Sequence, residues 1–360
     1  MNPSVSGAVL KEDYHGYVKR KIVFTAAILT LIILISGVAL TLGGRKIEFL
    51  QVYQILWNHL TGNLPVKGTD AFFDDYAVWS VRLPRVIVGI VVGACLAVGG
   101  AAMQSAVKNP LADPYTTGIS SGAVFGVSIA IVMGFGLGTT VGTYGLVLNA
   151  FIFGMLPSAA IVVISKFTKS SPATLILVGV AMTYLFNAAS TLILIGSSTE
   201  QLQQAYLWQI GTLENVNWDY VPLMTAVTII GTVFLLAVSP KLNLLTAGDN
   251  SAKSLGLDPE TFRIIILVVL SVMTASVVGF VGIIGFVGLV SPHIVRMIIG
   301  ADNKYLIPAS AMFGAAFLLA ADLIARLVIY PGSIAVGVVM SFVGAPIFLV
   351  LIIRSRKEMW

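Results

Sequence analysis

Side chains that could exchange protons or bind ions are nearly absent from the long apolar stretches of this chain. Away from the ends of those stretches only four ionisable side chains occur, namely His293, Arg296, Asp322 and Arg326. Buried carboxylates and histidines are the groups through which membrane proteins couple work to a proton or sodium gradient. Their scarcity argues against a protein that draws its energy from such a gradient.

Motifs of enzyme chemistry are missing as well. The chain contains no H-E-x-x-H or G-x-S-x-G sequence, so neither a zinc protease nor a serine hydrolase site is indicated. It also has no G-x-x-x-x-G-K-[ST] loop to cradle ATP. The chain is therefore not expected to be an enzyme, to hold a cofactor or to hydrolyse ATP itself. Any ATP that drives its work must be used by another subunit.

His293 is a candidate metal or haem ligand by residue type. It lies near the end of an apolar stretch, one helical turn before Arg296. A structural hydrogen bond to backbone freed by the neighbouring glycines is the favoured interpretation. The single cysteine, Cys95, lies inside an apolar run and is interpreted as a small core residue, so no metal site is expected.

The composition places the chain in a membrane. Hydrophobic residues make up 57% of its 360 residues and charged residues only 10%, whereas soluble domains carry about 25% charged residues. Apolar runs near 18 residues or longer recur along the chain. We expect an all-α polytopic membrane protein with about ten spans in a single domain, 1–360. The spans are predicted at 22–43, 84–106, 115–136, 141–165, 173–197, 219–239, 263–281, 284–299, 305–328 and 333–353.

The distribution of Lys and Arg orients these spans. Most of the basic residues between spans fall on the side of residues 1–21 and 241–263, which predicts cytoplasmic N- and C-termini. The net charge of +5 then reflects membrane orientation and gives no reason to expect nucleic acid as a partner. Contact with membrane lipid follows from the apolar spans themselves.

Four glycines recur at every third position near the seventh and eighth predicted spans: Gly279, Gly282, Gly285 and Gly288. Residues 263–299 are too few for two full crossings of about 20 residues each, so at least one span must be short or broken here. Tight packing between helices explains the glycines at least as well as an unwound segment that lines a pathway. We expect an irregular segment packed against its neighbours, in which Gly285→Leu causes steric overlap.

Several motifs together resemble the FecCD permeases: VRLPR (81–85), NPLADP (109–114), LTAGDNSAKSLGL (245–257), GFVGLVSPHIVR (285–296), LLAADLIARL (318–327) and VGAPIFLVLI (343–352). That family forms the membrane subunit of binding-protein-dependent ABC importers for iron siderophores, haem and cobalamin. The resemblance implies a homodimer in the cell membrane with two cytoplasmic ATPase subunits and an extracytoplasmic binding protein. It also implies that spans 2–5 and 7–10 are inverted repeats.

The resemblance assigns roles to three arginines at the outer side. Arg82, Arg85 and Arg326 match residues that meet acidic groups on the binding protein, so we expect Arg82 and Arg85 to be exposed. Membrane-interface anchoring is the plainer alternative. Asp322, four residues before Arg326, is an alternative partner for that arginine.

On the inner side the resemblance places gates and a coupling element. Asn109 and Leu111 match one gate, and Pro172 and Ala173 occupy the second, where family members often carry small hydroxyl residues. Gly285 and Gly288 are expected to line the pathway. The loop 241–263 is expected to couple to the ATPase through Gly248, Ala252, Ser254, Leu255 and Gly256.

The cargo stays open at this stage. A metal chelate, first of all an iron siderophore, is expected from the resemblance, with cobalamin, haem or an oxyanion such as molybdate as alternatives. A secondary transporter is the alternative from another class, and a membrane enzyme is disfavoured by the missing motifs.

Overall fold

The computed structural model describes residues 3–136, 143–168, 171–329 and 332–355. These residues form a bundle of α-helices, and the strand-like pairing among them is a single bridge between Ile210 and Ile283. In order, the helices are α1 Pro3–Thr41, α2 Phe49–Thr61, α3 Asp70–Asp75, α4 Leu83–Val107, α5 Ile119–Met133, α6 Thr143–Ile164, α7 Pro172–Ile195, α8 Thr199–Gln209, α9 Val221–Ala237, α10 Ser239–Ala247, α11 Asp249–Ser254, α12 Pro259–Val281, α13 Val287–Ile299, α14 Asn303–Val328 and α15 Val336–Ser355. The short segments η1 Tyr76–Arg82 and η2 Pro114–Thr117 are π-helical and 3₁₀-helical turns.

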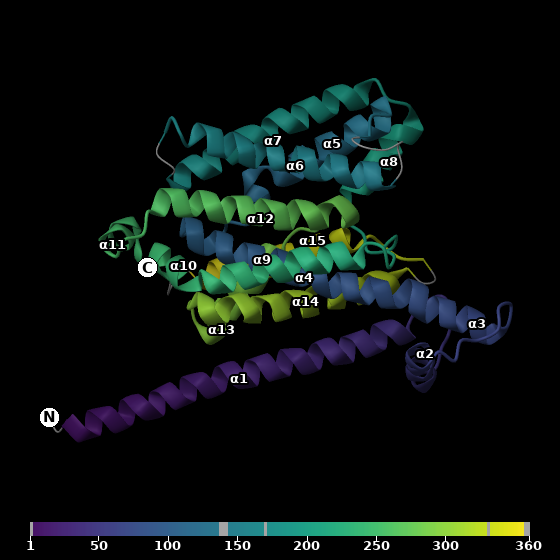
Figure 1. The fold of residues 1–360 in the computed structure, drawn as a ribbon, viewed down its shortest axis with the longest axis horizontal. Coiled ribbons are helices and arrows are strands. Elements are labelled where there is room, and N and C mark those ends of the chain that lie inside the picture. Colours follow the sequence, from purple (N-terminus) through teal and green to yellow (C-terminus); the bar gives the residue numbers. More distant parts are fainter. Residues whose placement is uncertain (1–2, 137–142, 169–170, 330–331, 356–360) are drawn as a thin grey trace.

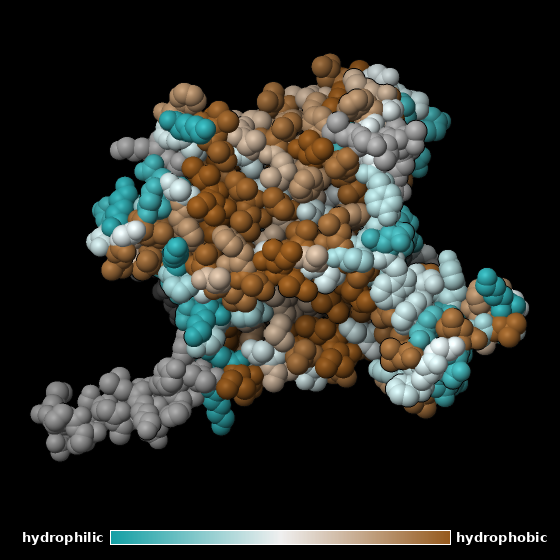
Figure 2. Space-filling view, in the orientation of Figure 1, coloured by the Kyte–Doolittle hydropathy of each residue, from teal (hydrophilic) through white to brown (hydrophobic). Residues whose placement is uncertain are grey.

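The long helices run along one axis with connections at two ends (Figure 1). One end carries α10 and α11, and α1 starts on that side; the opposite end carries α2, α3 and α8. We name them the inner end and the outer end after the predicted orientation. Apolar side chains cover the middle of the visible face, and hydrophilic residues gather toward the two ends (Figure 2). This distribution is that of a protein surrounded by lipid between two aqueous surfaces.

Each of the ten predicted spans falls on a helix, which confirms an all-α membrane protein. Among the described residues six helices are long and apolar enough to cross a membrane, and α9 with α10 forms a seventh, bent by 57°. The remaining three, α5, α13 and α15, are shorter or have shorter apolar parts. The number of full crossings and the side on which the termini lie stay predictions.

The two four-helix blocks, α4–α7 and α12–α15, pack against each other through equivalent pairs of helices. Helix α4, the first helix of one block, packs along α14, the third of the other. Helix α12, first in its block, packs in the same way along α6. After its first helix each block has an irregular segment, residues 108–118 in one and 282–286 in the other. Each block thus places its first helix along the third helix of the other, which agrees with the predicted repeat.

Glycine allows the helices to approach closely. A Cβ atom on Gly100 of α4 would overlap the carbonyl oxygen of Gly288, and one on Gly93 would overlap that of Gly314. In lipid, where helices gain little from hydrophobic burial against one another, such close packing is a main source of association. These contacts fasten α4 to both α13 and α14.

The structure gives no support to the predicted steric role of Gly285 at the level of a Cβ atom. Its position is open, because no other atom lies within 4 Å of the place that a Cβ atom would occupy, whereas a Cβ atom on Gly288 would lie 3.0 Å from the Leu96 carbonyl oxygen. The three-residue spacing turns successive glycines around the helix, so it does not show which of them faces a neighbour.

We expect Gly100→Ala to destabilise the protein by about 1–3 kcal/mol, because the added methyl group overpacks the α4–α13 contact. Gly285→Ala is the matched control, and it should leave the thermal unfolding temperature of the purified protein nearly unchanged. Equal unfolding temperatures for both variants would contradict this account of the packing.

Candidate functional site: the two ends of the bundle

The arginines predicted to dock a partner lie inside the outer end. Arg82, Arg85 and Arg326 are only 5%, 8% and 8% exposed, so the expectation that Arg82 and Arg85 are exposed was wrong. Together with Glu214 they line a small cavity of about 160 Å³. Whether a partner reaches them stays a prediction.

The acceptors of these arginines explain their burial. Arg82 donates to the carbonyl oxygens of Leu40 and Thr41, each at 2.8 Å, and Arg326 donates to that of Ala39 at 3.0 Å. These carbonyls belong to the last turn of α1, where no helical N–H follows to satisfy them. The arginines therefore cap α1, and their positive charge suits the negative end of its dipole.

Asp322 joins two of the arginines. It accepts from Arg85 Nε at 3.0 Å and Nη2 at 2.8 Å, and from Arg326 Nη2 at 2.5 Å, while being 1% exposed. The pairing of Arg326 with Asp322, left open from the sequence, is thus present. The cluster ties α4 to α14, and through Arg82 and Arg326 both helices are tied to α1.

The irregular segment between α12 and α13 is present, as predicted, and is packed against its neighbours. Gly282 (φ 72°) and Phe286 (φ 66°) both adopt left-handed backbone conformations. The freed backbone is paired with the strap that follows α8, which we define as residues 210–214. Gly211 N donates to Ile283 O at 3.1 Å, Thr212 N to Val281 O at 2.8 Å, and Gly337 N to Gly211 O at 2.8 Å. Unwound backbone inside a membrane protein requires such partners.

At the inner end the predicted gate residues form two helix-terminal turns. Asn109 Oδ1 accepts from Leu111 N at 2.9 Å, and the Leu111 side chain is 45% exposed. Pro172 starts α7 and is followed by the exposed Ala173, while Ser171 caps the helix by accepting from Thr174 N at 3.1 Å. The turn η2 packs against α7. The role of both predicted gates stays a prediction.

The predicted coupling loop forms α10 and α11. Gly248 (φ 114°) and Gly256 (φ 82°) bracket α11 in conformations that favour glycine. Ala252 is buried against the bundle, Ser254 bonds its own helix, and Leu255 is 67% exposed. Of the predicted coupling residues, Leu255 thus offers an apolar side chain to a partner.

Arg263 fixes α11 to the bundle. Its buried guanidinium pairs with Asp249 at the start of α11, with Nη1 3.0 Å from Oδ2, and its Nε donates to Ala106 O of α4 at 2.9 Å. The Arg263 side chain lowers the pKa of Asp249 below its ordinary value through this hydrogen bond. Asp249 therefore stays ionised near neutral pH, and α11 is attached to the inner end of α4.

His293 does not make the predicted hydrogen bond. It is 3% exposed, and neither ring nitrogen has a partner in the described part of the chain. As for metals, the described residues hold no group of three His, Cys, Asp or Glu side chains that could bind one.

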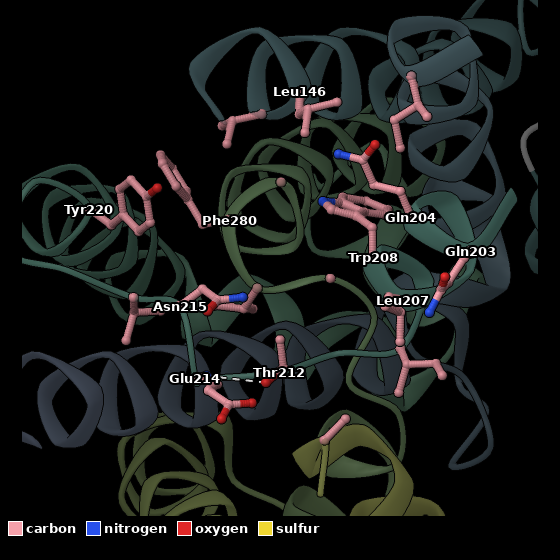
Figure 3. A pocket seen from close by; sticks show the side chains of 18 of the residues that line it. Leu146, Gln203, Gln204, Leu207, Trp208, Thr212, Glu214, Asn215, Tyr220 and Phe280 are labelled. Atoms are coloured by element: carbon pink, nitrogen blue, oxygen red, sulfur yellow. Dashed lines mark hydrogen bonds between the residues drawn. The ribbon is translucent and has the colours of Figure 1, made fainter. Parts of the chain in front are cut away.

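A cavity of about 740 Å³ opens at the outer end, and sequence reasoning missed it. Helix α8 contributes Gln204, Leu207 and Trp208 to one wall, while Tyr220 and Phe280 form another (Figure 3). The strap continues its lining with Thr212, whose hydroxyl accepts from Glu214 N at 3.1 Å. Helix α8 is too polar to be recognised as a membrane-spanning helix from its hydropathy. Its capping box, Ser198 with Gln201, was a sequence signal that could have located it.

Apolar helices with irregular breaks between them and a cavity at one end are features found in the membrane-embedded subunits of transporters. The chain belongs to the FecCD transport family, whose model matches residues 28–354. It is accordingly a multi-pass membrane protein.

Two relatives and one solved structure support this membership. The hemin transport system permease protein HmuU of Yersinia pestis is 35% identical, over 96% of this chain and 99% of that protein. The iron(3+)-hydroxamate import system permease protein FhuB of Bacillus subtilis is 33% identical, over 91% and 82%. The solved structure, described as an inward-facing conformation of a metal-chelate type ABC transporter, is similar with a TM-score of 0.79 and 28% identity, covering 92% of this chain and 98% of that one.

We expect Asp322→Asn to destabilise the protein by about 3–5 kcal/mol, because it leaves two buried arginines without their shared anion. The matched control is Asp70→Asn, which removes an exposed partner of Arg45 and should change the stability little. Denaturation of the purified variants measures both. A small loss for Asp322→Asn would contradict the role of this carboxylate in joining α4 to α14.

Proposed function

We propose that the chain is the permease subunit of a binding-protein-dependent ABC importer that takes up a metal chelate, in the first place an iron siderophore. Membership of the FecCD transport family supports a role in transport. Relatives named for hemin and for iron(3+)-hydroxamate support a chelate as the cargo. Cobalamin, haem and oxyanions such as molybdate are the alternative cargoes. A secondary transporter has no support from the comparisons.

In this proposal the permease acts as a homodimer with two ATPase subunits at the inner end and a binding protein at the outer end. The observation that favours the inner contact is Leu255, a large apolar side chain exposed in water beside α11. Arg263 joins α11 to α4. A displacement of α11 by the ATPase would therefore be transmitted to α4. The chain would perform no chemistry on the cargo.

The outer contact would use the arginine cavity. Arg82, Arg85 and Arg326 carry three positive charges. Buried Asp322 and Glu214, which lines the same cavity, supply two negative charges. The remaining positive charge favours acidic groups of a binding protein, chiefly through orientation and rate of encounter. The burial of the arginines limits this contact to the rim of the cavity.

We expect Leu255→Asp to abolish most chelate uptake and the stimulation of ATP hydrolysis by the loaded binding protein, because a carboxylate would be desolvated in the ATPase contact. Leu255→Met is the control, since it keeps an apolar side chain of similar size and should transport almost normally. Uptake by the complex in proteoliposomes measures both variants. A cysteine at Ser254 should also crosslink to one in the ATPase cleft; normal uptake by Leu255→Asp without any crosslinking would refute the coupling role.

A further inference from the structure

The walls of the 740 Å³ outer cavity combine amides and aromatic rings. Gln203, Gln204 and Asn215 present neutral hydrogen-bonding groups, and Trp208, Tyr220 and Phe280 present rings. Binding sites for small molecules occupy about 300–1,000 Å³ and combine apolar walls with a few polar groups. The cavity has the size and lining of such a site.

The charge of the lining has one sign. Glu200 and Glu214 are its ionisable carboxylates, and no Lys, Arg or His is among the described residues that line it. Glu200 lies in the first turn of α8, where backbone hydrogen bonding and the Ser198 hydroxyl lower its pKa. Its carboxylate is therefore ionised at neutral pH.

The outer arginines are not part of this lining. They line the separate 160 Å³ cavity, and Glu214 with Ser333 lines both cavities. Arg85 and Arg326 share the Asp322 carboxylate, while Arg82 points its guanidinium at carbonyls of α1. Glu214 therefore stands between the arginines and the larger cavity. Glu200, at the start of α8, does not line the arginine cavity.

We propose that the 740 Å³ cavity is a vestibule for the cargo that admits neutral or cationic chelates and disfavours anionic ones. The inference rests on the proposed function and narrows its substrate class. A neutral chelate can stack on the Trp208 ring and form hydrogen bonds with the amide side chains, and the two carboxylates do not repel it. A polyanion meets two carboxylates and finds no cation among the described residues of the wall. Free oxyanions such as molybdate are disfavoured for the same reason.

The test compares two ferric chelates that differ in charge. A ferric trihydroxamate is neutral, because three singly charged ligands balance Fe³⁺, whereas a ferric tricatecholate carries three negative charges. Binding is measured at low salt, where surface charge acts most strongly, on the purified permease–ATPase complex without binding protein, by quenching of tryptophan fluorescence. Trp208→Phe identifies the part of the signal that comes from the cavity.

We expect the neutral chelate to bind at least about tenfold more tightly than the trianion. In the double variant Glu200→Gln, Glu214→Gln this ratio should shrink severalfold, and in the control variant Asp219→Asn, which changes an exposed carboxylate outside the cavity, it should not. Equal or tighter binding of the trianion, a ratio unaffected by the double variant, or quenching that Trp208→Phe leaves unchanged would each overturn the proposal. ATP-driven uptake with the binding protein is measured in parallel: uptake without charge preference refutes only the vestibule, and absence of any uptake refutes the proposed function.

Discussion

The structure depends on the rule that backbone N–H and C=O groups inside a bilayer need partners within the protein. Wherever a helix ends at depth, another segment must therefore supply donors or acceptors. Two arginines and the strap satisfy this requirement at two places. Arg82 and Arg326 satisfy the last carbonyls of α1, and the strap satisfies the break between α12 and α13. Both solutions use residues far away in the sequence.

The same rule connects the elements at the outer end. Gly211 bonds to Ile283 through its N–H and to Gly337 through its carbonyl, so α8, the α12–α13 break and the start of α15 meet at one residue. The cavity proposed as a vestibule is built on this junction, with Gly282 and the strap in its wall. A displacement of α8 would therefore also move the segment between α12 and α13 and the start of α15. Along the bundle the close glycine contacts hold the helices together, since Gly100 meets Gly288 directly.

Much of the fold could be predicted from the sequence because hydropathy is local. The apolar stretches marked every long helix, and the shortness of 263–299 indicated the break before its geometry was known. The partners of Arg82 and Arg85 could not be predicted, because they lie 42 and 237 residues away along the chain. Arginines beside a span are equally consistent with exposure and with burial until those partners are placed. Family resemblance pointed to these positions, and only the structure revealed their burial.

Long-range packing also decided the roles of the glycines and the place of the cavity. Spacing identified Gly285 and Gly288 together, yet only Gly288 contacts another helix closely. The outer cavity is lined from several helices and the strap, so no continuous stretch of sequence marks it. In contrast, the glycine pattern of residues 241–263 has a local cause, because Gly248 and Gly256 turn the chain at the two ends of α11.

The central claim is that this chain provides a pathway and draws its energy from ATPase subunits at the inner end. The most direct measurement reconstitutes the permease with its ATPase and binding protein in vesicles and follows uptake of a ferric chelate. The account predicts uptake when ATP is supplied on the side of α11, and none when a proton or sodium gradient is imposed without ATP. Gradient-driven uptake by the permease alone would contradict it.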